Sequence, residues 1–255
     1  MIEGLFLFSV ALVGGALNSV AGGGGFLCFP ALIFMGMPPI NANATNTAAL
    51  WPGTAASTAA YRSEIAAYRR MIAPLIITGI LGGLMGAVLL LKTPQLTFLR
   101  MVPWLLLSAT LLLVFSKHVT AWIGAHPQEG SDHPTRGNIL RATILQLLIA
   151  VYIGFFGAGA GILMLAMLAV MGMRNIHAMN GLKVLLATVS NGVALTTFIV
   201  AKAVVWPQAL LMVCGATLGG YGGAWYAQRV DPKLVRQFAV LTGACMTVYF
   251  FIKYP

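Results

Sequence analysis

The chain has 255 residues, of which 59% are hydrophobic and 8% charged, with a mean hydropathy of +0.90. Ordinary soluble domains carry roughly 25% charged residues, so the composition excludes a soluble protein and predicts a single polytopic membrane domain over residues 1–255. The net charge is +10, but the basic residues are scattered among short polar segments, which suits anionic lipid headgroups and not nucleic acid, for which no basic stripe is present.

The first half of the chain contains apolar segments of membrane-spanning length, about 20 residues each. They cover about residues 4–36, 42–61, 72–91 and 96–116. Pro39 follows the first segment and helps to end it, because proline lacks the backbone N–H. In the third segment, Gly79 and Gly83 form one Gly-x-x-x-Gly pair and Gly82 and Gly86 form another. Such pairs let neighbouring helices approach closely.

A run of four glycines interrupts the first segment. It consists of Gly22, Gly23, Gly24 and Gly25. Each glycine costs a helix about 1 kcal/mol, so the run predicts a break in the helix. The apolar part after the break, 26–37, is either the second half of a broken helix or a re-entrant arm. A break inside the membrane requires backbone that is buried in protein or faces a water-filled cavity.

The second half repeats this plan after a polar linker at residues 117–139. Its apolar segments cover about residues 140–172, 179–200, 205–227 and 233–252. An offset of 136 residues places Gly79 on Gly215 and Gly83 on Gly219. The glycines of the second break are Gly157, Gly159 and Gly161. A tandem duplication is the simplest explanation of this pattern.

We therefore predict an all-α integral membrane protein with two tandem repeats, residues 1–116 and 140–255. Each repeat has about four transmembrane segments and begins with a glycine-broken helix. Four crossings per half, which we favour, make the repeats parallel. Five crossings per half, with both arms of the broken helix crossing, make them an inverted pair. Two such breaks in corresponding halves point to the binding site of a transporter.

Polar side chains follow both breaks. Asn43 and Thr47 come after the first break and either bind a solute or cap the second segment. Asn180 and Lys183 come after the second, and Asn191 lies inside the next apolar segment. A lysine at the bilayer centre costs about 3 kcal/mol on insertion scales. Lys183 therefore either faces an anionic solute inside the protein or extends its ammonium to the headgroups.

A half-helix that begins just after either break would point its free N–H groups and positive dipole end at an anion. The predicted anion site consists of Gly22, Gly23, Gly24, Gly25, Asn43, Thr47, Gly159, Gly161, Asn180, Lys183 and Asn191. Trp51 is interpreted as an interface or kink residue outside this site. His177 is interpreted as a loop histidine, with no second ligand nearby for a metal.

Enzymatic and cofactor-dependent functions find no support in the sequence. The three cysteines are odd in number and widely spaced, which argues against disulfides and Cys-rich metal sites. No Walker motif, His-Glu-x-x-His or Gly-x-Ser-x-Gly is present. All five acidic residues fall in loops or at segment ends, so we expect no buried carboxylate relay for protons. Neither a metal nor a cofactor is therefore predicted.

Three motifs together resemble the TauE/SafE family of sulfite exporters and toluene sulfonate uptake permeases. They are the Phe-Leu-Cys-Phe-Pro run at 26–30, the Ala-Asn-Ala-Thr-Asn-Thr run at 42–47, and Asn180-x-x-Lys183. The resemblance implies a multi-pass transporter of the bacterial inner membrane that moves sulfite, an organosulfonate or a related carboxylate. We expect a secondary transporter that works by alternating access, with an intramembrane enzyme or an anion channel as alternatives. Its expected partners are the anion, membrane lipid and, as an open alternative, a second copy in a homodimer.

Overall fold

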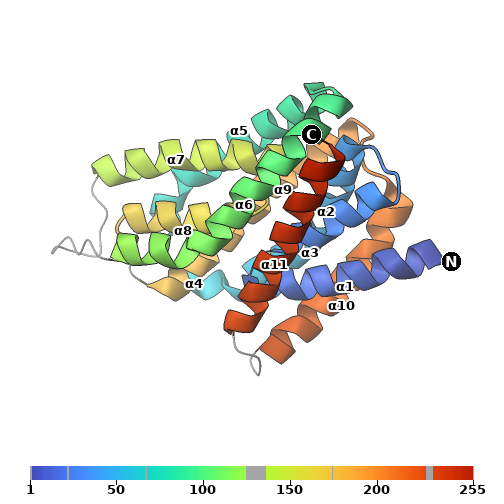
Figure 1. Ribbon diagram of the computed structural model, residues 1–255. Coiled ribbons are helices and arrows are strands. Elements are labelled where there is room, and N and C mark those ends of the chain that lie inside the picture. Colours follow the sequence, from blue (N-terminus) through green and yellow to red (C-terminus); the bar gives the residue numbers. More distant parts are fainter. Residues whose placement is uncertain are drawn as a thin grey trace.

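The computed structural model describes residues 2–21, 23–66, 68–124, 136–173, 175–227 and 232–254. Within these ranges the chain forms helices joined by short turns and contains no strand, as the all-α prediction requires. Figure 1 shows them as α1 (Ile2–Ala21), α2 (Gly25–Phe34), α3 (Pro39–Ala60), α4 (Arg62–Ala66), α5 (Arg69–Lys92), α6 (Gln95–Gly124), α7 (Arg136–Phe155), α8 (Ala160–Val170), α9 (Ile176–Val200), α10 (Trp206–Ala227) and α11 (Pro232–Lys253).

Four of these helices are long and apolar enough to cross a membrane. They are Ile72–Lys92, Gln95–Phe115, Gly137–Phe155 and His177–Val200. Shorter apolar helices cover Ile2–Asn18, Gly25–Phe34, Ala160–Val170 and Gln237–Lys253. Residues 125–135 of the predicted linker lie outside the described residues, and the flanking parts of the linker continue α6 and α7.

At the first glycine run the chain turns back on itself. In one continuous helix, Gly14 and Cys28 would lie about 21 Å apart, at 1.5 Å per residue. In the structure a Cβ placed on Gly14 would instead lie 2.5 Å from Cys28 Sγ and 3.3 Å from Gly24 O. Helix α2 therefore folds back along α1. Its 10 residues reach about 15 Å, half of the hydrocarbon core, so the first break produces a re-entrant arm.

The second break has a similar form. Gly157 and Gly159 adopt positive φ angles of 78° and 73°, in the left-handed region that glycine enters without steric cost. The hydroxyl of Tyr152, on α7, donates at 2.6 Å to the backbone carbonyl of Ala158, which lies between these two glycines. The turn leads into the 11-residue helix α8, which packs against α7.

Helices α1 and α10 lie side by side and run in the same direction, because residues later in α1 meet residues later in α10. The contacts pair Gly4 with Leu211, Phe8 with Gly215, and Leu12 with Gly219. Helices α5 and α7 form a second pair of this kind. Their contacts join Gly79 to Gln146, Gly82 to Ala150, and Gly86 to Gly154. The glycines of α5 thus allow the close helix approach that their spacing predicts.

Helices α3 and α9 cross the middle of the fold in opposite directions. Their contacts join Trp51 to Gly192, Thr58 to Thr188, and Tyr61 to Gly181. Helices α1, α3 and α10 all begin at the same end of the fold, near residues 203–211. We call it the α3-start end. Helices α5, α7 and α9 begin at the opposite end, beside α4, which we call the α4 end.

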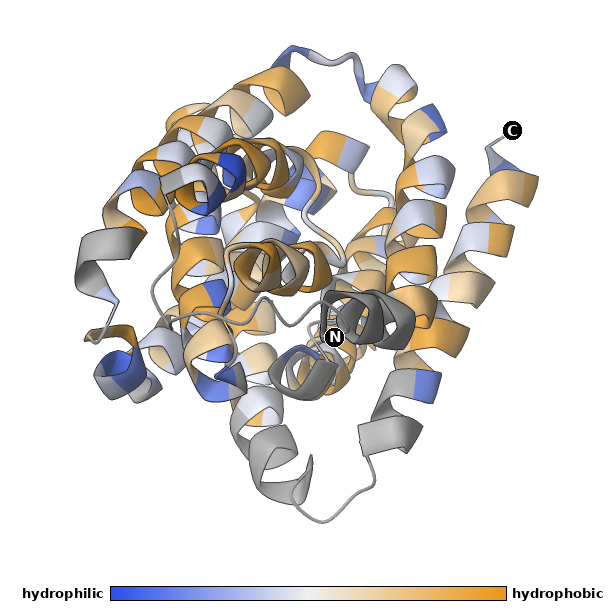
Figure 2. Ribbon diagram, turned by 90° about the vertical axis from the view of Figure 1, so that its left-hand side faces the viewer, coloured by the Kyte–Doolittle hydropathy of each residue, from blue (hydrophilic) through white to orange (hydrophobic). Residues whose placement is uncertain are grey.

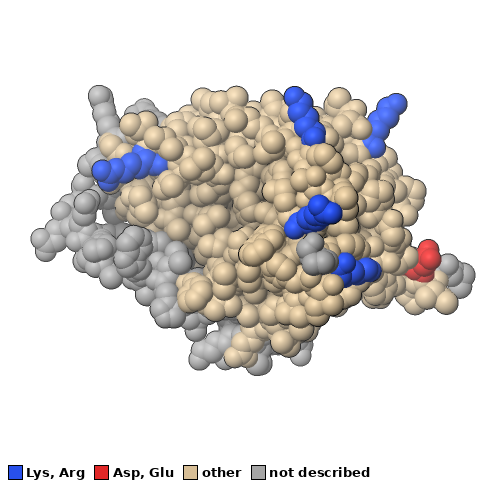
Figure 3. All heavy atoms as spheres, turned by 45° about the horizontal axis from the view of Figure 1, so that its top comes forward, with Lys and Arg blue, Asp and Glu red and all other residues tan. Residues whose placement is uncertain are grey.

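The outer surface is apolar. Trp104, Leu148 and Leu241 are each more than 60% exposed, at 65%, 62% and 63%. Figure 2 shows hydrophobic residues along most of the described helices, including those at the outside of the bundle. In Figure 3, a region without Lys, Arg, Asp or Glu separates one basic side chain near the left end of the molecule from a group of basic side chains toward the right. Such a surface suits a protein that is surrounded by lipid.

Candidate functional site

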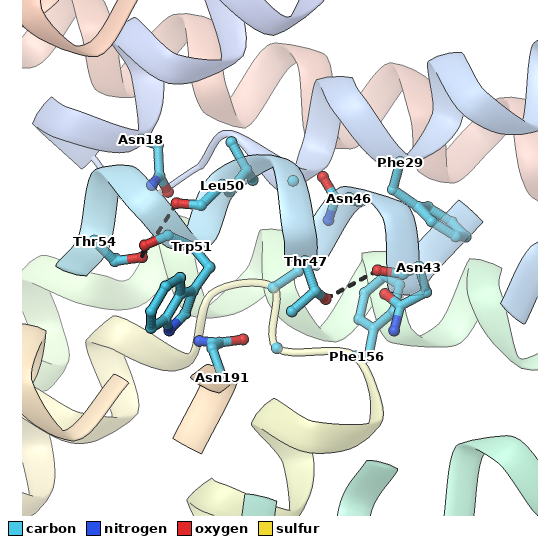
Figure 4. Close-up of a pocket in the computed structure, with 13 residues that line it drawn as sticks. Asn18, Phe29, Asn43, Asn46, Thr47, Leu50, Trp51, Thr54, Phe156 and Asn191 are labelled. Carbon is cyan, nitrogen blue, oxygen red and sulfur yellow. Dashed lines mark hydrogen bonds between the residues drawn. The ribbon is translucent and has the colours of Figure 1, made fainter. Parts of the chain in front are cut away.

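A cavity of about 100 Å³ lies where the two re-entrant turns meet α3 and α9. Its lining consists of Asn18, Gly25, Phe29, Asn43, Asn46, Thr47, Leu50, Trp51, Thr54, Phe156, Gly157, Ala158 and Asn191. Figure 4 shows these side chains along α3, with Asn191 of α9 opposite α3 and the turn before α8 passing below them in this view. Among the described residues, the lining contains amides, hydroxyls, aromatic rings and backbone but no charged side chain.

Helix α3 provides the largest wall of the cavity. Its lining residues follow the sequence spacing 0, 3, 4, 7, 8 and 11, which is one face of an α-helix. They are Asn43, Asn46, Thr47, Leu50, Trp51 and Thr54. The polar Asn- and Thr-rich run at 42–47 therefore belongs to the first turns of this helix, behind Pro39 at its start. It directs amides into the protein, where Asn43 is 2% and Asn46 7% exposed.

The amide of Asn43 ties α3 to the second re-entrant turn. Its Nδ2 donates to Phe155 O at 3.2 Å. The Thr47 hydroxyl donates to the backbone carbonyl of Asn43 at 2.9 Å. Asn43 Oδ1 and Asn46 Oδ1 are buried and have no protein partner in the described structure. Buried polar atoms almost always have a partner, so such atoms call for a specific explanation.

The turn before α2 uses most of its own N–H groups. Phe26 N donates to Gly23 O, and the N–H groups of Leu27 and Cys28 donate to Gly24 O. Gly25, the first residue of α2, is the part of this turn that borders the cavity. The positive end of the α2 dipole thus faces the cavity at Gly25.

Of the predicted site residues, four line the cavity. They are Gly25, Asn43, Thr47 and Asn191. The others in the glycine breaks lie in the surrounding turns. Gly24 packs against Gly14 O, Gly23 lies beside Phe26, and Gly159 caps α8 against Ala109. Gly22 is outside the described residues.

Asn180 and Lys183 lie outside the cavity lining. They form a pair on α9, in which Lys183 Nζ donates to Asn180 Oδ1 at 2.9 Å. Both residues are half-buried. A Cβ placed on Gly161, the remaining predicted residue, would lie 3.5 Å from Lys183 Cδ. The predicted residues therefore separate into a cavity group and a Lys183 group.

The structure places Trp51 at the cavity, contrary to its interpretation as an interface or kink residue. Its Nε1 donates to Thr188 O at 3.0 Å, and its indole ring lies over Gly192 of α9. The missed signal is its position four residues after Thr47, on the same face of α3. Phe29 and Phe156, which pack edge to face at 5.5 Å between ring centroids, were also missed because aromatic residues in apolar runs resemble ordinary core.

The titratable side chains of the described residues form no cluster that could hold a metal ion. In the described parts of the chain no three His, Cys, Asp or Glu residues gather. At the α4 end, the Ser63 hydroxyl donates to Glu64 at 2.7 Å and lowers the pKa of this carboxyl, with His177 acting weakly in the same direction. Glu64 is therefore ionised at neutral pH, outside the membrane-spanning part of the fold.

Comparison with known proteins gives a consistent result. A model of the family described as "Sulfite exporter TauE/SafE" matches residues 7–250. A "Probable membrane transporter protein" of Haemophilus influenzae is 28% identical over 244 residues, covering 94% of this chain and 91% of the relative. "Probable membrane transporter protein ORF9" of a Sinorhizobium species is 28% identical over 246 residues, covering 95% and 90%.

"Probable membrane transporter protein YfcA" of Escherichia coli K12 is 30% identical over 246 residues, covering 94% of this chain and 87% of the relative. The family match extends over nearly the whole helical fold, including both re-entrant turns and the cavity between them. The relatives are transporters by name, and the four spanning helices agree with a multi-pass protein of the bacterial inner membrane. The chain belongs to the TauE/SafE family of membrane transporters.

Proposed function

We propose that the protein is a secondary transporter that carries a small anion, such as sulfite, an organosulfonate or a related carboxylate. The observation that carries the proposal is the uncharged, amide-lined cavity between the two re-entrant turns and the α3–α9 crossing. The family description names sulfite export, and this points to the class of anion without selecting one substrate.

The size of the cavity supports a small solute. Pockets for drug-sized ligands have volumes of about 300–1,000 Å³, whereas this cavity has about 100 Å³. Its lining carries the amide group of Asn46 and that of Asn191, whose Nδ2 also donates one hydrogen to Ala187 O at 3.0 Å, together with the backbone at the start of α2. Neutral donors and a helix N-terminus hold an anion without a fixed counter-charge, which favours a site that must also release its solute.

The helix pairing supports two repeats of inverted orientation. Helix α1 occupies the same place in the first half as α7 in the second, and the two begin at opposite ends of the fold. The same holds for α3 and α9. The fold-back of α2 gives each half five helices of alternating direction. This arrangement favours the inverted alternative over four parallel crossings per half.

Inverted repeats around a central site are the architecture of alternating-access carriers. At the α3-start end of this structure, hydrogen bonds join the start of α3 to segments far from it in the sequence. Asn41 Nδ2 donates to Ala203 O at 2.9 Å, and Val205 N donates to Thr45 Oγ1 at 3.1 Å. Ile40 N donates to Gln95 Oε1 at 2.9 Å. We assign these bonds to a gate that opens in the other half of the transport cycle.

Counterflow in proteoliposomes tests this function. Vesicles preloaded with unlabelled sulfite should transiently accumulate ³⁵S-labelled sulfite above its external concentration, with an initial rate that saturates. Simple sulfonates and short carboxylates should compete. A rate that rises linearly with concentration, without accumulation, indicates a channel, and conversion of sulfite to a product indicates an enzyme. Either result contradicts the proposal.

A further inference from the structure

The Lys183 group lies on the same face of α9 as the cavity. Asn180, Lys183 and Asn191 are separated by three and eight residues, and eleven residues make about three helical turns. Asn191 lines the cavity. Lys183 is eight residues before it, about 12 Å along the helix axis in the direction of the α4 end.

Helix α8 brings Lys183 to the edge of the cavity. Ala158 lines the cavity, and Gly161, three residues later, packs against the aliphatic part of Lys183. The side chain of Lys183 therefore passes beside the second re-entrant turn. Its ammonium donates to Asn180 Oδ1, one helical turn earlier on α9.

The charge of Lys183 is poorly compensated by its protein surroundings. An ammonium carries three donors, and its partner in the described structure is the neutral amide of Asn180. The positive dipole end of α8 lies next to it and adds a like charge. Among acids with described side chains, Glu3 is at the start of α1, and Glu64 is bonded to Ser63 on α4. A half-buried cation in these surroundings favours a mobile anion beside it.

The polar residues between Lys183 and the cavity mark a route. Thr54 lines the cavity, and one turn later Thr58 shares a hydrogen bond of 2.9 Å with Thr188 of α9. All three hydroxyl-bearing side chains are half-buried. The opposite end of the cavity is fastened by the Asn41–Ala203 bond and its neighbours. Thr54, Thr58 and Thr188 are therefore the polar side chains that an anion would pass between the α4 end and the cavity.

We propose that Lys183 and Asn180 form an outer anion station, distinct from the cavity, on the access route at the α4 end. This inference rests on the proposed function. The incoming anion replaces Asn180 Oδ1 as the partner of the Lys183 ammonium, loses part of its hydration there, and moves on to the neutral donors of the cavity. Lys183 thus determines how readily the anion is captured from solution, and the cavity holds the anion during the conformational change.

The experiment measures ³⁵S-sulfite counterflow with the label presented separately at each end of the protein, in vesicles of defined orientation. For sulfite presented at the α4 end, Lys183→Gln should raise the half-saturation concentration about tenfold, as expected for one partly screened charge. The maximal rate should change less than about twofold, and the difference from wild type should shrink in high salt. Sulfite presented at the α3-start end should show no such increase.

Three further variants separate this role from a structural one. Lys183→Arg should behave like the wild type because it keeps the charge. Asn180→Asp should raise the half-saturation concentration as Lys183→Gln does, because a carboxylate would hold the ammonium permanently. Lys92→Gln removes an exposed lysine at the α3-start end and is the matched control, with no effect on capture at the α4 end.

The outcomes distinguish the inference from the function on which it rests. If Lys183→Gln leaves the half-saturation concentration unchanged, or abolishes the maximal rate at every concentration while Lys183→Arg retains it, the outer station is wrong. The proposed function survives both results. If the wild-type protein shows no saturable counterflow of sulfite, sulfonates or carboxylates, the proposed function itself fails.

Discussion

Asn43 is held at two points, because its Nδ2 donates to Phe155 O and its backbone carbonyl accepts from the Thr47 hydroxyl. Asn43→Asp keeps the shape, removes the donor and introduces a negative charge. We expect transport of an anion to fall by about two to three orders of magnitude, since like charges about 4 Å apart oppose each other by roughly 4 kcal/mol in a protein.

The same change of charge at the exposed residue Gln237 provides the control for Asn43→Asp. Gln237→Glu should transport at the wild-type rate. Initial rates of labelled sulfite counterflow measure both variants. Equal rates for Asn43→Asp and Gln237→Glu would remove Asn43 from the substrate site.

Gln146 and Ser190 are buried polar residues away from the cavity. Both are fully buried at the contact of α5, α7 and α9, beside Gly79, and their side-chain polar atoms have no partner in the described structure. Replacing an unpartnered buried polar group by an apolar one of similar shape is neutral or stabilising. Gln146→Met should therefore raise the free energy of unfolding by up to about 2 kcal/mol. A lower midpoint of thermal unfolding in detergent would reveal a hydrogen-bonding partner, such as an internal water.

At the scale of elements, the contact between α5 and α7 depends on glycine. A Cβ on Gly86 would overlap Val151 O of α7, whereas a Cβ on the helical residue Gly53 meets nothing within 4 Å. Gly86→Ala should destabilise the protein by about 1–3 kcal/mol through overpacking. Gly53→Ala should stabilise it by about 0.5–1 kcal/mol, because alanine is the better helix former. Thermal unfolding of the two variants in parallel measures the difference, and equal shifts would contradict the close packing.

The elements that sequence reasoning predicts best are those with a local cause. Apolar length predicts the spans, the glycine spacing predicts the close contacts of α5, and the glycine run predicts the first break. Whether the chain continues or turns back at Gly24 depends on the contact with Gly14, which no local pattern encodes. For the same reason, the sequence places Asn43 and Lys183 in one site, whereas in the structure Asn43 lines the cavity from α3 and Lys183 lies outside the lining, on α9.

Across the fold as a whole, α1 and α7 run in opposite directions. Glu3 and Gly137 are exposed residues at the starts of these two helices. In a background without native cysteines, Glu3→Cys and Gly137→Cys should react with a membrane-impermeant maleimide from opposite sides of the membrane. Parallel repeats of four crossings would make both residues accessible from the same side.

The proposed function requires the cavity between the re-entrant turns to hold the anion. Selenite has the charge and shape of sulfite, and selenium scatters X-rays anomalously. An anomalous difference map of crystals soaked in selenite should show a peak bordered by Gly25, Thr47 and Asn191, and the peak should be absent from Asn43→Asp crystals. A peak elsewhere in the protein, with this cavity empty at saturating selenite, would contradict the account.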